Sequence, residues 1–99
     1  MSYVEVANIW DAATDTPEEA ANMRMRSELM MSLDDLIKKK AWTQAEAARH
    51  LGITQPRVSE LVNGKIQLFS LDQLMTLLAR AGYRVEMKVK KIRAQKRAA

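Results

Sequence analysis

Apolar residues along this chain recur mostly at helical spacing. Between residues 17 and 40 they return every three or four positions, over a stretch with unbroken helical propensity. These positions are Leu29, Leu33, Leu36 and Ile37. Thr16 or Asp15 can cap the start of the stretch, and Pro17 is tolerated in a first turn. The pattern therefore predicts a long amphipathic helix over residues 17–40.

Two short helices joined by a tight turn are predicted between residues 43 and 64. Thr43 and Glu46 have the spacing of a capping box, which starts the first helix. Gly52 ends that helix, because glycine adopts a positive φ at little cost. Thr54 is a plausible cap for the second helix, whose first turn tolerates the proline that follows. The residues expected to face inward are Ala45, Ala48 and Leu51 in the first helix and Val58, Leu61 and Val62 in the second.

A fourth helix and a strand are predicted after residue 69. Ser70 and Gln73 form a second capping box, and Gly82 closes the helix. Beyond it, apolar and charged residues alternate, which predicts a strand over residues 83–90 with one apolar face. The apolar residues are Tyr83, Val85, Met87 and Val89. A strand needs a hydrogen-bonded neighbour, so we expect it to pair either with the segment Tyr3–Ile9 or with the same strand of a second chain.

The charges divide the chain into two unequal parts. Residues 1–37 carry two basic and eight acidic side chains, a net charge of −6, whereas residues 38–99 carry fourteen basic and four acidic ones, a net charge of +10. Such a division suggests two partners of opposite sign, with the basic part a candidate for nucleic acid.

Several classes of protein are disfavoured by what the sequence lacks. It has no cysteine, no apolar run long enough to span a bilayer and no secretory signal at its start, so we expect a cytoplasmic protein without a membrane segment. A single histidine, His50, stands without a catalytic partner set, a phosphate-binding glycine loop or metal-ligand spacing. We expect no enzymatic activity, cofactor or metal.

The two short helices carry the motif of a known family. A small residue in the middle of the first helix is followed by a glycine, an apolar plug, and a valine and a leucine inside the second helix. These residues are Ala48, Gly52, Ile53, Val58 and Leu61. In this respect the sequence resembles the XRE family of phage-repressor-like helix-turn-helix proteins, over about residues 25–82.

The resemblance implies a mainly α fold, with four to five helices in a repressor-like helix-turn-helix domain. The alternation after residue 82 adds a short C-terminal β-strand. Residues 1–16 would form an N-terminal arm, residues 17–82 the helical domain, residues 83–90 a dimerising strand and residues 91–99 a basic tail.

The resemblance also implies which residues meet DNA. The second helix of such a motif enters the major groove, where its side chains meet base edges. The implied base-contacting residues are Gln55, Pro56, Arg57, Ser59 and Glu60. Contacts to phosphate, which position the protein without reading sequence, are implied for Gln44, Thr54, Asn63 and Lys65. We expect the protein to dimerise through the strand residues Tyr83, Val85, Met87 and Val89, and the dimer to bind a palindromic operator.

Two kinds of DNA-binding regulator fit this reading. The run from Trp42 to Lys65, followed by the helix after Ser70, resembles the HigA-like antitoxin branch of the family. That resemblance implies a partner, a small basic ribonuclease toxin, and repression of the protein's own operon. The acidic N-terminal segment, with Trp10 as an apolar anchor, suits docking onto such a toxin. The alternatives are a stand-alone repressor, and an arm that instead pairs with the strand at Tyr83–Val89.

Overall fold

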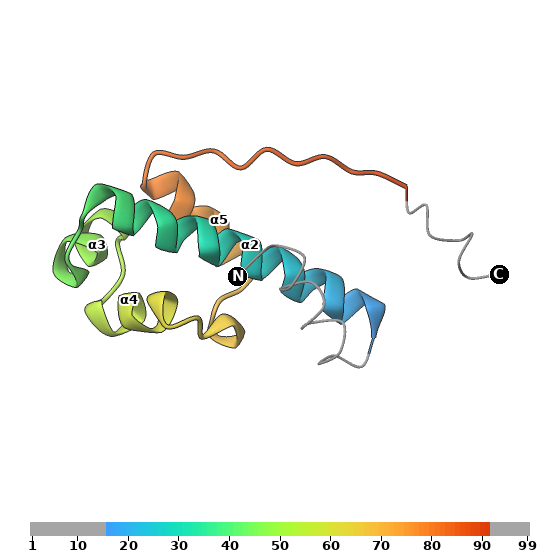
Figure 1. Cartoon of the computed structure of the whole chain (residues 1–99), viewed down its shortest axis with the longest axis horizontal. Coiled ribbons are helices and arrows are strands. Elements are labelled where there is room, and N and C mark those ends of the chain that lie inside the picture. The colour runs from blue at the N-terminus through green and yellow to red at the C-terminus, as the bar shows by residue number, and fades with distance from the viewer. Residues whose placement is uncertain (1–15, 92–99) are drawn as a thin grey trace.

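The structure, a computed structural model, describes residues 16–91. In this range four α-helices and one 3-10 helix follow one another. They are α2 (Pro17–Lys40), α3 (Gln44–Leu51), α4 (Gln55–Val62), η1 (Ile66–Leu68) and α5 (Leu71–Arg80). The long helix α2 runs the length of the domain, α3 and α4 lie beside its C-terminal half, and its first turns extend past the other helices (Figure 1). The predicted mainly helical fold is confirmed.

The long helix α2 has both of its ends defined locally. Thr16 caps it, since the threonine hydroxyl accepts a hydrogen bond of 3.0 Å from the Glu19 N–H. At the other end the chain turns at Ala41, which has the left-handed φ of 57° although it is not a glycine. The N–H of Trp42 then reaches back to the Ile37 carbonyl at 3.1 Å, as in a Schellman turn.

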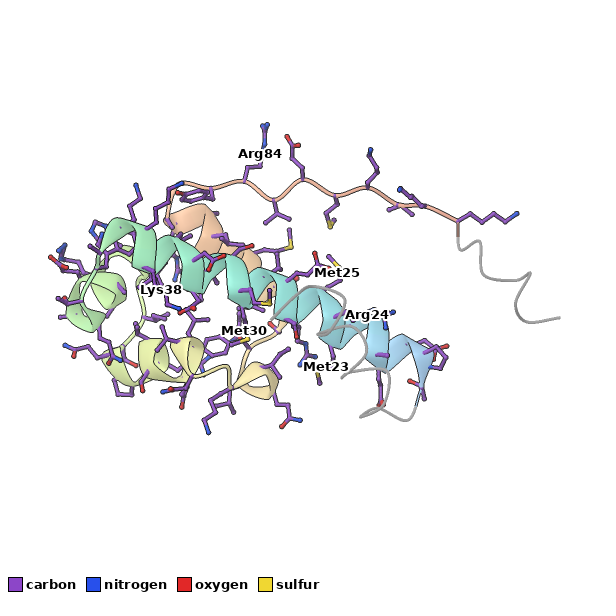
Figure 2. The ribbon with its side chains drawn as sticks, in the orientation of Figure 1. Met23, Arg24, Met25, Met30, Lys38 and Arg84 are labelled. Atoms are coloured by element: carbon purple, nitrogen blue, oxygen red, sulfur yellow. The ribbon has the colours of Figure 1, made fainter. Side chains whose placement is uncertain are left out.

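The core forms where α2 meets the helices that follow it. Side chains on one stripe of α2, among them Leu33 at 0% exposure, pack with Phe69 and with the apolar face of α5. The buried residues of the core are Leu29, Met30, Leu33, Leu36, Ile37, Ala47, Ala48, Leu51, Val58, Leu61, Ile66, Phe69, Leu74, Leu77 and Leu78. Met30 points from α2 toward this core, whereas Met25 projects from another side of the helix and is 38% exposed (Figure 2).

One predicted inward position in α3 is wrong. Ala45 is exposed, and Ala47 is buried in its place. The buried face of this helix is therefore Ala47, Ala48 and Leu51, at spacings of one, three and four rather than three throughout. A period of 3.6 residues allows both patterns in so short a helix, and the packing against α4 and α5 selects between them.

The predicted strand is absent from the described residues. Residues 83–91 leave α5 as an extended stretch that runs along the domain opposite to the chain direction of α2, without strand pairing (Figure 1). Val85 packs partly against the core, but Tyr83 is 43%, Met87 68% and Val89 95% exposed. A strand exists only through hydrogen bonds to a neighbour, and residues 16–91 supply none. The expected arm and most of the basic tail lie outside the described residues, as does the alternative pairing partner Tyr3–Ile9.

No helix within residues 16–91 combines the length and apolar character that crossing a bilayer requires.

Candidate nucleic-acid interface

The start of α3 is held by the predicted capping box. The Thr43 hydroxyl accepts a 3.1 Å hydrogen bond from the Glu46 N–H, and Glu46 Oε1 accepts a 2.8 Å bond from the Thr43 N–H. The backbone N–H bond from Thr43 is the main reason why the pKa of Glu46 lies below its ordinary value. Within the described chain the N–H groups of Gln44 and Ala45 have no acceptor, so they remain available to an anion at the positive end of the helix dipole.

The turn between α3 and α4 is closed by a glycine and by a distant arginine. Gly52 has a φ of 71°, and its N–H donates to the Ala48 carbonyl at 2.8 Å. Arg80, at the end of α5, donates from Nη1 to the Leu51 carbonyl at 3.0 Å. A Cβ added to Gly52 would approach Arg80 Nη1 to 3.1 Å. The turn therefore needs glycine for its backbone angle and has little space for a side chain.

The orientation of α4 is set by its buried residues. Val58 and Leu61 are 0% and 1% exposed, which fixes the opposite side of the helix toward solvent. Thr54 caps the helix by accepting a 3.3 Å hydrogen bond from the Arg57 N–H. The first turn is open, with Gln55 and Pro56 both exposed. This open first turn is the part of a helix-turn-helix that can reach base edges.

The residues predicted to contact bases differ in how free they are. The side chain of Gln55 makes no hydrogen bond within the described residues, and Pro56 offers only an apolar surface. Ser59 and Glu60 are half-buried. The guanidinium of Arg57 is occupied, because it donates to Glu60 Oε1 at 2.8 Å and to the Leu68 carbonyl at 3.1 Å. To contact guanine, Arg57 would first have to leave these partners.

The residues predicted to contact phosphate also fall into two groups. Gln44 and Lys65 are exposed, and their side chains have no hydrogen-bond partner in the described part of the chain. Thr54 is engaged as the cap of α4. Asn63 uses its amide nitrogen to bind the Ser59 carbonyl at 2.8 Å and the Ser59 hydroxyl at 3.2 Å. Its side chain therefore closes α4 in the free protein.

Two further features of this surface were not foreseen. The rings of Trp42 and His50 stack with their centroids 4.1 Å apart and an angle of 8° between their planes, which braces α3 across its length. Trp42, Glu46 and His50 follow one another at spacings of four, which places them on one side of α3. This spacing is the sequence feature from which the stacking could have been predicted. The hydrogen bond from Arg80 to the Leu51 carbonyl joins residues 29 positions apart, so no local sequence pattern predicts it.

The family of the chain follows from its similarity to known proteins. The family described as helix-turn-helix domain matches residues 12–90. A solved structure, provisionally named an XRE family transcriptional regulator, is 38% identical to the chain. Its TM-score is 0.68, and the match covers 73% of this chain and 81% of that one. The chain belongs to the XRE family of helix-turn-helix proteins. No curated protein matches it in sequence. For this XRE-family chain, α3 and α4 are the two helices of the DNA-binding motif.

Proposed function

We propose that the protein is a transcriptional repressor that binds an operator upstream of its own gene. The observation that carries this proposal is the open first turn of α4, which the burial of Val58 and Leu61 turns toward solvent. The free side chain of Gln55 lies on that turn and can form paired hydrogen bonds with adenine in the major groove. Pro56 beside it can contact a thymine methyl group.

Contacts to the DNA backbone would hold α4 in the groove. The N–H groups at the start of α3 and the side chain of Gln44 suit one phosphate, and Lys65, just after α4, suits another. The net charge of +10 on residues 38–99 favours this binding to any duplex, since bound cations release counterions from DNA.

The repressor would act as a two-fold dimer. Residues 83–90 are extended and carry exposed apolar side chains, so pairing with the same segment of a second chain would supply the missing strand neighbour. Two recognition helices would then fit a palindromic operator whose half-sites lie roughly 34 Å apart, one helical turn of DNA.

The partner of this repressor would be a toxin. The resemblance to HigA-like antitoxins supports this, as do the eight acidic side chains of residues 1–37, which suit a small basic ribonuclease. In this proposal the protein is itself no enzyme. It neutralises its toxin by binding it, and it represses the operon that encodes both.

Footprinting on DNA upstream of the protein's own gene tests the proposal. We expect a protected palindrome. We also expect that a small basic protein purified together with the chain changes the fraction of this operator that is protected. Protection by the chain alone, with no small basic protein co-purifying from the native host, would identify a stand-alone repressor. If no part of the upstream DNA is protected, and the chain binds this DNA no more tightly than random DNA, the proposed regulation is overturned.

A further inference from the structure

Arg57 is held in the free protein by three contacts, one within α4 and two to Leu68 and Phe69 at the end of η1. Besides its hydrogen bonds to Glu60 and to the Leu68 carbonyl, its guanidinium carbon lies 4.1 Å from the centre of the Phe69 ring. Phe69 is 1% exposed, so the ring beneath the guanidinium belongs to the core. The side chain of Arg57 is thus stacked and hydrogen-bonded in one place, a use for which the planar guanidinium is suited.

Glu60 gains a defined position from this arrangement. It follows Pro56 by four residues, so it lies one turn further along the exposed side of α4. Its Oε1 is bound to Arg57, whereas its Oε2 accepts no hydrogen bond from the residues that the structure describes. The ion pair is partly shielded, with the two side chains 32% and 35% exposed. Arg57 thereby compensates a carboxylate that phosphates would otherwise repel.

The remaining acceptor of Glu60 suits one base better than the others. In the major groove cytosine offers an amino donor, N4, and a carboxylate can accept from it. Adenine offers an amino donor, N6, beside the acceptor N7. N7 repels a carboxylate, because both groups are acceptors and neither has a hydrogen to donate. Guanine and thymine present acceptors only. A fixed carboxylate at this position therefore selects cytosine.

We propose that Arg57 is a positioning residue, clamped on Phe69 and Leu68, which holds Glu60 so that its free oxygen reads the N4 amino group of a cytosine in each half-site. This inference rests on the proposed DNA binding, and it gives Arg57 a role other than the base contact implied by family resemblance. The sequence preference at that position comes from Glu60, and Arg57 acts through it.

Selection of binding sites from a randomised duplex pool, using the full chain, tests the proposal. The wild-type protein should prefer cytosine at one position of each half-site by about 10- to 150-fold, the range for one hydrogen bond to a charged group. Glu60→Gln should move that preference to adenine, because the glutamine amide can bind N6 and N7 together. Arg57→Met keeps an apolar stem on the Phe69 ring but removes the charge and both hydrogen bonds. It should lose the cytosine preference and keep the preferences at the other positions.

Two control variants separate this effect from changes in charge. Lys38 pairs with Asp34 at 2.9 Å within α2, outside α3, α4 and residues 83–90, and its side chain is 74% exposed. Lys38→Met should therefore leave every base preference unchanged. Lys65→Ala should weaken all sequences alike and reduce the salt dependence by about one counterion. Adding Arg57→Met to Glu60→Gln should change nothing further at the cytosine position, because the residue that Arg57 positions is already altered.

Each other outcome has a definite meaning. A guanine preference that disappears with Arg57→Met and persists in Glu60→Gln would show that Arg57 reads DNA directly, which overturns the inference and leaves the proposed function intact. A wild-type protein that selects no sequence overturns both. Circular dichroism checks that each variant keeps its helix content. If Arg57→Met does not fold, the Glu60→Gln result alone decides. A Glu60→Gln variant that keeps the wild-type base preference at every position would refute the role of Glu60.

Discussion

At the scale of single residues, Ala41 is held in an unfavourable conformation. Its φ of 57° places its Cβ close to backbone that glycine would not meet, at a cost of roughly 1–2 kcal/mol. Ala41→Gly should therefore raise the free energy of unfolding by about 1 kcal/mol, as the relief exceeds the extra entropy of the unfolded chain. Ala21→Gly, on an exposed position inside α2, should lower it by about 0.5–1 kcal/mol. Equal losses in urea unfolding of both variants would contradict this account.

Glu46 makes the stability of the domain depend on pH. Its pKa is lower in the folded chain than its ordinary value of 4.5, because its carboxylate accepts the Thr43 N–H. The stabilisation is therefore present above pH 4.5 and is lost as the pH falls through the lower, folded pKa. Glu46→Gln keeps an oxygen acceptor but cannot titrate, so the stability gap between wild type and variant should narrow on acidification. Urea unfolding at several pH values measures this gap, and a constant gap would exclude the effect.

At the scale of elements, the helices could be predicted because their signals are local. The boxes Thr43–Glu46 and Ser70–Gln73 each span four residues, and both form as expected. The role of Arg57 could not be predicted in this way, because its partners Leu68 and Phe69 become neighbours only after folding. Pairing of the predicted strand at residues 83–90 stays a prediction for a related reason, since it depends on a second segment that residues 16–91 do not contain.

The extended segment after α5 is the element on which dimerisation would depend. A chain ending at Val85 keeps the valine that packs on the core but lacks the exposed Met87 and Val89. This truncated chain should be monomeric, keep its helix content and lose operator affinity, because each monomer holds only one half-site. Sedimentation velocity gives the oligomeric state. Lys88→Met, which leaves the backbone and the neighbouring apolar residues in place, should remain dimeric. A dimer formed by the truncated chain would place the interface elsewhere, with the exposed Met25 side of α2 as the next surface to test.

At the scale of the whole molecule, the acidic residues 1–37 and the basic residues 38–99 would bind different partners in the proposed function. DNA would bind at the N-terminal ends of α3 and α4, where N–H groups are unpaired, and Lys65, after the end of α4, would add a contact to phosphate. The acidic residues of the first third would be repelled from phosphate there. Glu18 and Glu19 lie in the first turn of α2, the end of that helix that extends past the rest of the domain (Figure 1). In the proposed function, this separation would allow one chain to engage a duplex and a basic protein together.

Removal of residues 1–15 tests whether the first third of the chain holds the toxin. The deleted segment carries Trp10 among acidic residues, a combination that suits an anchor in a pocket of a basic protein. The shortened chain should lose capture of a co-expressed toxin and keep its operator affinity, since α3, α4 and residues 83–90 are retained. Trp10→Ala should weaken capture by at least about 2 kcal/mol if Trp10 is the anchor, whereas Asp11→Asn should chiefly slow association. If the shortened chain unfolds or no longer binds its operator, the segment supports the fold, and the pairing of Tyr3–Ile9 with Tyr83–Val89 becomes the better explanation.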